Sequence, residues 1–334
     1  MIEIPANHKY ATLAFRTNHV TLQCSEPLDL GEDLWITGEM PVALPDHWNT
    51  WLGSLRVDEL KRTNLFMFSR KPANTLAVLD HENRQLQEAV RRLYFAFLIA
   101  TPYIGHTNGT LMTGAHQKNG VLDVREVQSY DDVLSACGCH GAILNDDVFR
   151  QARRIYDGLS QVEGAGEHNR IWRIVRAFFS ALQEKQLGAR IHQFTRCVEG
   201  FVFPDQGNTR AQMASRTELF LGPTQHALIQ TLFDIRSAVE HLHNPAAILD
   251  DLDPNEIDLK LAEYNFKSET LAHYCLQRLF TTPILWPHFA DDAALAAFWQ
   301  LPMNKRSTLW GAPMDLNVDF APFSRRTAAI QLMP

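Results

Sequence analysis

The segment LFDIRSAVEHLHNP, residues 232–245, contains side chains that suit chemistry on a phosphate group. Arg236 keeps its charge at any physiological pH, and its planar guanidinium can pair with two phosphate oxygens. His241 follows five positions later, and an imidazole that titrates near neutrality can accept or donate a proton. Ser237, next to the arginine, is suited to positioning a phosphate or a nucleophile. The segment therefore predicts a site that binds phosphate and transfers protons.

Helix geometry leaves the choice of histidine open. Each residue of an α-helix advances by about 100°, so Arg236 and His241 lie about 140° apart. Glu240 and His243 are four and seven positions after the arginine and share its face. His243 is therefore an alternative to the favoured His241. Glu240 can also form an ion pair that neutralises Arg236, and the segment would then be a structural helix end with a surface salt bridge.

The elements that must position these side chains are predicted to be helices. Apolar residues recur at helical spacing from Thr224 to about His243, after Gly222-Pro223 and before Asn244-Pro245, which stop a helix. Further helices are predicted over residues 170–185, 190–203, Thr209–Leu221 and 254–280.

The N-terminal part of the chain has a different pattern. Short β-rich stretches include Thr12–Cys24 and Leu34–Glu39, a helix is predicted over His81–Ala100, and Lys118-Asn119-Gly120 marks a hairpin turn. The expected fold class is α+β, with an N-terminal domain of mixed helices and strands followed by an all-helical bundle.

Domain boundaries follow from composition. The stretch GLSQVEGAGEH, residues 158–168, is small, polar and glycine-bearing, which is typical of a junction between domains. We expect a domain over residues 1–160 that senses a signal or binds a partner, a helical bundle over 165–290, and an irregular tail over 291–334.

Charge is unevenly distributed along the chain. The net charge of −7 argues against a protein that coats nucleic acid by bulk electrostatics. The eight basic residues from 170 to 216 outnumber the three acidic ones, and they are Arg170, Arg173, Arg176, Lys185, Arg190, Arg196, Arg210 and Arg216. A solvated charged face explains such a run, and a strip that binds a phosphate backbone is the alternative.

Residues 169–280 resemble the HEPN superfamily, in particular its Apea-like branch. The resemblance consists of an arginine-rich helix, a helix with a central glutamate in RCVEGFVF, a helix containing MASRTELFLG, and the Arg-Ser-x-x-x-His helix, in that order. By this resemblance, the protein is expected to be a ribonuclease of a defence or toxin system that needs no cofactor or metal ion. It would act as a homodimer that brings two Arg/His motifs together, under the control of a protein or phage-derived trigger.

In an RNA substrate the 2′-hydroxyl serves as the nucleophile, so Arg236 would stabilise the transition state while His241 or His243 transfers protons. Arg170, Arg173 and Arg176 are then candidates for contact with RNA. Glu199 and Arg216, on neighbouring helices, are predicted to form a structural pair. Two alternatives remain open: a non-catalytic HEPN module that binds RNA, nucleotide or a protein as scaffold or antitoxin, and a bundle that only dimerises.

Other chemistry is less well supported by the sequence. Cys137-Gly138-Cys139-His140 offers three soft ligands, but a structural zinc site needs four and no second cluster matches it. The five scattered cysteines and the N-terminal sequence MIEIPANHKY are typical of a reduced cytoplasmic protein. The longest apolar run is too short to cross a membrane, so no membrane association is expected.

Overall fold

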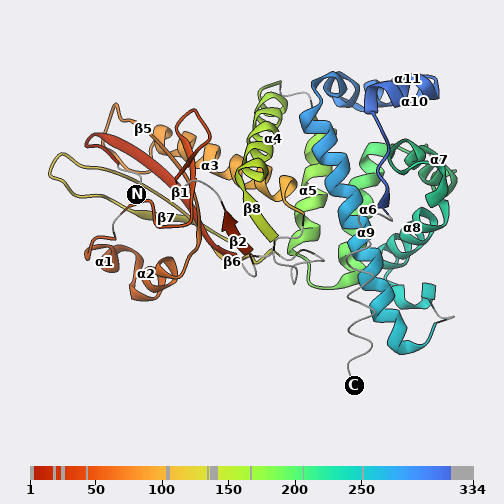
Figure 1. Ribbon diagram of the computed structural model, residues 1–334, viewed down its shortest axis with the longest axis horizontal. Coiled ribbons are helices and arrows are strands. Elements are labelled where there is room, and N and C mark those ends of the chain that lie inside the picture. Colours follow the sequence, from red (N-terminus) through yellow and green to blue (C-terminus); the bar gives the residue numbers. More distant parts are fainter. Residues whose placement is uncertain are drawn as a thin grey trace. The chain divides into compact units, whose positions relative to one another are not determined.

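The computed structural model describes residues 4–17, 20–23, 27–42, 44–102, 106–133, 135, 142–165, 168–205, 207–249 and 252–316. These residues form two compact units (Figure 1). The first contains residues up to 133 together with 142–159, and the second contains residue 135 and residues 160–316. The first unit is a mixture of strands and helices and the second is helical, which confirms the α+β class.

An antiparallel sheet of six strands forms the first unit, in the order β3-β4-β5-β1-β6-β7. Its strands are β1 (His8–Thr17), β3 (Leu28–Asp29), β4 (Leu34–Thr37), β5 (Leu65–Pro72), β6 (His106–Ala115) and β7 (Arg125–Tyr130). A separate parallel pair joins β2 (Val20–Gln23) to β8 (Ala142–Asn145). The helices are α1 (Trp48–Leu52), α2 (Ser54–Lys61), α3 (His81–Ala100) and the part of α4 (Asp146–Ala165) that ends at Leu159.

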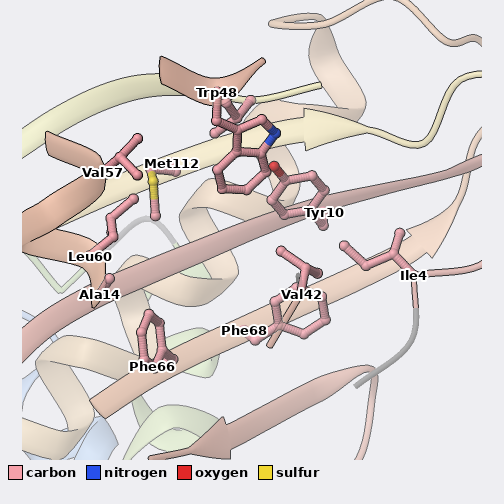
Figure 2. Packing of buried hydrophobic residues seen from close by; sticks show 11 residues of the cluster. Ile4, Tyr10, Ala14, Val42, Trp48, Val57, Leu60, Phe66, Phe68 and Met112 are labelled. Atoms are coloured by element: carbon pink, nitrogen blue, oxygen red, sulfur yellow. The ribbon is translucent and has the colours of Figure 1, made fainter. Parts of the chain in front are cut away.

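Both faces of the sheet are covered by helices, so the central strand β1 is buried along almost its whole length. Tyr10 and Ala14 point to one face, where they pack with Trp48 from α1 and Leu60 from α2 (Figure 2). Phe15 points to the other face and packs against aromatic residues of α3. The core of this unit therefore consists of two layers on either side of β1.

Several predicted elements of this unit are confirmed. The helix α3 has the predicted bounds, and the side chain of Asp80 accepts a hydrogen bond from the Asn83 N–H to cap it. The strands β6 and β7 form the predicted hairpin, with Gly120 at a φ of 81° in the connection.

The second unit is a bundle in which α6 packs against α5, α8 and α9. Its helices are α5 (Asn169–Gln183), α6 (Leu187–Val202), α7 (Thr209–Leu221), α8 (His226–Glu240), α9 (Pro254–Thr281), α10 (Asp292–Gln300) and α11 (Met303–Trp310). Short 3-10 helices span η1 (Pro223–Gln225), η2 (Pro245–Leu249) and η3 (Pro283–Phe289). The five predicted helices of the bundle are all present, and α7 has the predicted bounds.

The prediction of an irregular tail from residue 291 is wrong over the part that the structure describes. The Asp291 side chain accepts a hydrogen bond from Ala294 N–H at 2.7 Å and starts α10, and α11 follows it. Trp299 and Trp310 are buried and pack against Phe220 of α7. This region therefore completes the core of the bundle.

The predicted domain junction is also largely helical, since α4 continues to Ala165. No helix in the described ranges has both the length and the apolar character that a membrane crossing requires.

Candidate functional site

A cavity of about 390 Å³ lies between α5 and α6 in the second unit. One face of each helix lines it, with residues at the i, i+3, i+4 and i+7 positions: Arg170, Arg173, Ile174 and Ala177 from α5, and Arg196, Glu199, Gly200 and Phe203 from the C-terminal half of α6 and the residue after it. Pro204, Thr209 at the start of α7, and Arg236 of α8 complete the wall.

Gly200 allows α5 and α6 to approach closely at this cavity. A Cβ atom at this position would lie 2.4 Å from Cγ1 of Ile174, which is too close for any real contact. Both residues line the cavity. A larger residue at position 200 would therefore separate the two helices and change the shape of the site.

Arg236 lies between two carboxylates. Its Nη2 donates to Oε2 of Glu199 at 3.1 Å, and its Nη1 forms an ion pair with Glu240 one helical turn away. The Nε of Arg236 is buried and has no hydrogen-bond partner among the described residues. The predicted pairing of Glu240 with Arg236 is thus present, and an incoming phosphate would compete with these carboxylates for the guanidinium.

His241 and His243 lie beyond the last turn of α8, and both are exposed. The His241 N–H donates to the carbonyl of Ser237, and the centroids of the two imidazole rings are 6.2 Å apart. Among the described residues, neither histidine is part of the cavity wall formed by α5 and α6. The structure therefore brings Glu240, but not the two predicted histidines, to the Arg236 side chain within one chain.

His192 of α6 was not identified from the sequence. It lies four and seven positions before Arg196 and Glu199, and hence on the same helix face. Its Nε2 is buried without a hydrogen-bond partner in the described part of the chain. Burial lowers the pKa of His192, the charges of Arg196 and Arg236 lower it further, and Glu240 opposes them. The spacing of the three residues on one helix was the signal in the sequence.

The arginines of α5 differ in their surroundings. Arg170 donates to Oδ1 of Asp292 at 2.6 Å, and its guanidinium lies 4.3 Å from the centroid of the Phe203 ring. Arg173 is mostly exposed and lies 3.4 Å from the same carboxylate. Arg176 is exposed and is not among the residues that line the cavity. Only two of the three predicted RNA-binding arginines therefore line this site.

The predicted pair of Glu199 with Arg216 needs correction. Glu199 binds Arg236 instead. Arg216 forms an ion pair with Asp205 at 3.1 Å and donates to the carbonyl oxygens of Val202 and Phe203. Arg216 thus caps the C-terminus of α6, where helix carbonyls have no partners within the helix.

The charges around the cavity favour an anion. Four arginines, Arg170, Arg173, Arg196 and Arg236, surround it, and the three carboxylates that pair with them are Glu199, Glu240 and Asp292. Arg196 is exposed and forms no ion pair with a described residue. The N-terminus of α7 at Thr209 adds partial positive charge. A phosphate group can therefore be held here by paired and unpaired guanidinium groups.

Metal ligation has no candidate in the described ranges, where no group of three or more suitable side chains gathers. The Cys137–His140 segment lies outside the described residues. Cys197 and Cys275 are free and buried, and burial raises the pKa of both thiols.

The chain was compared with family models, with curated proteins and with solved structures, and no significant match was found in any of them.

Proposed function

We propose that the second unit is a HEPN-type helical bundle that binds RNA at the arginine-lined cavity and cleaves it without a metal ion. The observation that supports this proposal is the convergence of four arginines, Arg236 among them, on one cavity in a chain whose net charge is −7. Local concentration of guanidinium groups in an acidic protein favours binding of a phosphate backbone at this position.

Cleavage would use the 2′-hydroxyl of the substrate as nucleophile. As this oxygen bonds to phosphorus, a histidine accepts its proton, the bond to the 5′-oxygen breaks, and that oxygen receives a proton. The products carry a 2′,3′-cyclic phosphate and a 5′-hydroxyl. Arg236 would exchange one carboxylate for the phosphate and stabilise its negative charge in the transition state.

His241 is the proposed proton-transfer residue, with His243 as the alternative. Both imidazoles are exposed at the end of α8, where a second copy of the chain has access to them. In this proposal a homodimer joins two such helix ends, and the N-terminal unit responds to a protein or phage-derived trigger in a defence or toxin system.

The proposal is tested by incubating the full-length protein with cellular RNA in excess chelator. Arg236→Ala and His241→Ala are each expected to lower the rate by about 100-fold or more. Arg176→Ala is the matched control, because this exposed arginine lies off the cavity. If Arg236→Ala and His241→Ala cleave RNA as fast as wild type, the proposal is wrong.

A non-catalytic RNA-binding module is the second candidate, and the pairing of Arg236 with two carboxylates favours it. Glu240→Gln distinguishes the two, because it removes one of these charges. For a nuclease, this variant should cleave faster or be more toxic on expression than wild type. For a binding module, RNA binding tightens while RNA stays intact and growth is unaffected.

A further inference from the structure

Phe203 has an unusual backbone for an aromatic residue. It follows α6 in the left-handed region, with a φ of 49° and a ψ of 64°, where a large side chain is disfavoured and glycine is common. The carbonyl oxygens of Val202 and Phe203 accept hydrogen bonds from Arg216, and the Phe203 N–H donates to the backbone carbonyl oxygen of Glu199 at 2.9 Å. Positive φ also occurs at Leu79 and Leu242, so the backbone alone assigns no role.

The role of Phe203 is indicated by the position of its ring. The ring lines the cavity, is only partly buried, and stacks with the guanidinium of Arg170, which Asp292 holds in place. Two planar groups, one aromatic and one cationic, therefore form a fixed platform in the wall of a cavity that is otherwise rich in arginine. We refer to Phe203 and Arg170 together as the stacking platform.

Proteins bind unpaired nucleobases by stacking them on planar aromatic and guanidinium groups in a basic groove. A cavity of about 390 Å³ is within the size range of small-ligand sites. Arg173 and Arg196 line the same cavity and are exposed, so they are available to phosphate. Bases within a duplex are already stacked on both sides and cannot use such a platform.

We propose that the cavity takes one unstacked base of a single-stranded RNA on the stacking platform, with the adjoining phosphates on Arg173 and Arg196. This inference rests on the proposed function, because it names the form of RNA that the cavity selects. It also assigns Arg170 to the platform and not to the phosphates.

The test measures binding of two fluorescent 2′-O-methyl strands to the full-length protein by anisotropy. One strand carries bases and the other is abasic with the same backbone, and neither can be cleaved at a 2′-hydroxyl. Phe203→Leu should weaken binding of the strand with bases by about 10-fold, the range expected for one lost stacking contact, and leave the abasic strand unaffected. Phe203→Tyr, which keeps an aromatic ring, should bind both strands as wild type does.

Phe203→Gly separates binding from folding, because glycine adopts the left-handed backbone of this turn without a Cβ penalty. It should lose the same affinity for the strand with bases as Phe203→Leu. Equal weakening of both strands by Phe203→Leu, or no weakening of either, would overturn the inference, as would duplex RNA that binds as tightly as the single strand. If wild type binds neither strand, the proposed function fails together with the inference.

Discussion

His192, Arg196 and Arg236 form a group whose charges act on one another across α6 and α8. The pKa of His192 is lowered by burial first, then by the two arginines, while Glu240 acts in the opposite direction. The imidazole is therefore neutral over a wider pH range than an ordinary histidine.

Exchanging single charges should move the pKa of His192 in opposite directions. Arg196→Gln should raise it toward its ordinary value, because a repelling cation is removed, and Glu240→Gln should lower it further. NMR titration of the His192 ring measures both, with Arg176→Gln as a control that should cause no shift. A His192 pKa that is unchanged in both variants would show that these side chains do not act on the imidazole.

His106 gives the first unit a dependence on acid. Burial lowers its pKa from 6.5 to about 4, with Asp132 opposing the shift, and its Nε2 lies 2.7 Å from the Tyr94 hydroxyl. The unfolded chain binds the proton more tightly than the folded one. The contribution of neutral His106 to the free energy of unfolding is therefore fully present above about pH 6.5 and is lost as the pH falls toward 4. The loss should not exceed about 3 kcal/mol.

Urea unfolding of wild type and His106→Gln between pH 7 and 4 checks this prediction. The neutral glutamine should flatten the acid decline of the first unit. An equally steep decline in His106→Gln would assign the acid sensitivity to other groups.

The partners of Arg236 show which part of the site a sequence can predict. Its pair with Glu240 follows from a spacing of four residues within one helix, which geometry fixes. Its pair with Glu199 depends on how α6 packs against α8, because the two residues are 37 positions apart. The predicted pair of Glu199 with Arg216 is wrong for the same reason. Arg216 and Arg236 both lie on helices next to α6, and only the packing of these helices decides which of the two cations Glu199 contacts.

The helix α8 ends in a turn that places a large residue in the left-handed region. Leu242 has a φ of 60°, and the following His243 N–H donates to the carbonyl of Ala238 at 2.8 Å. This is the hydrogen bonding of a Schellman motif, in which glycine is the preferred residue. The Leu242 side chain is 93% exposed and contributes little packing.

Leu242→Gly should therefore stabilise the second unit by about 0.5–1 kcal/mol, because it removes the Cβ strain of this turn. Leu242→Ala is the matched control, since it shortens the side chain but keeps the Cβ atom. Denaturant unfolding compares the two. If the alanine variant is as stable as the glycine variant, the turn stores no strain at this residue.

Inside the bundle, α6 and α9 share a buried ion pair. Arg190 Nη2 lies 3.1 Å from Oε2 of Glu269, and their side chains are 4% and 0% exposed. Arg190→Leu should destabilise the second unit by about 3–5 kcal/mol, because the Glu269 charge would stay buried without its cation. The double variant Arg190→Leu/Glu269→Leu should regain most of that loss in chemical denaturation. Equal instability of the single and double variants would contradict this account.

Helix bounds were predictable wherever local signals agree. Asp80 caps α3 and Gly222 ends α7, and both helices have the predicted ends. The sequence predicts an irregular tail from residue 291, because this region is rich in Pro, Trp and Phe. Local signals for α10 are present in the sequence, namely the cap at Asp291 and the apolar run after it. The burial of Trp299, in contrast, depends on contacts with α7, which is distant in the sequence.

The whole molecule combines two units with separate cores. The sheet of the first unit is covered on both faces by its own helices, and the second is centred on α6. The change in hydrophobic period along the chain predicted this order of a mixed part and a helical part. The composition of residues 158–168 predicts a junction between domains, but α4 continues to Ala165, because within the helix only Gly158 and Gly164 interrupt a sequence that otherwise favours a helix.

In the proposed function, the arginine-lined cavity of the second unit holds the phosphates of RNA. The most direct test is the salt dependence of binding of an uncleavable single-stranded RNA to Arg173→Gln, Arg196→Gln and Arg176→Gln. Each lost phosphate contact lowers the slope of log affinity against log salt by about 0.7. The slope should fall by about that amount for Arg173→Gln and Arg196→Gln and stay at the wild-type value for Arg176→Gln. Identical slopes for all three variants and wild type would contradict the claim.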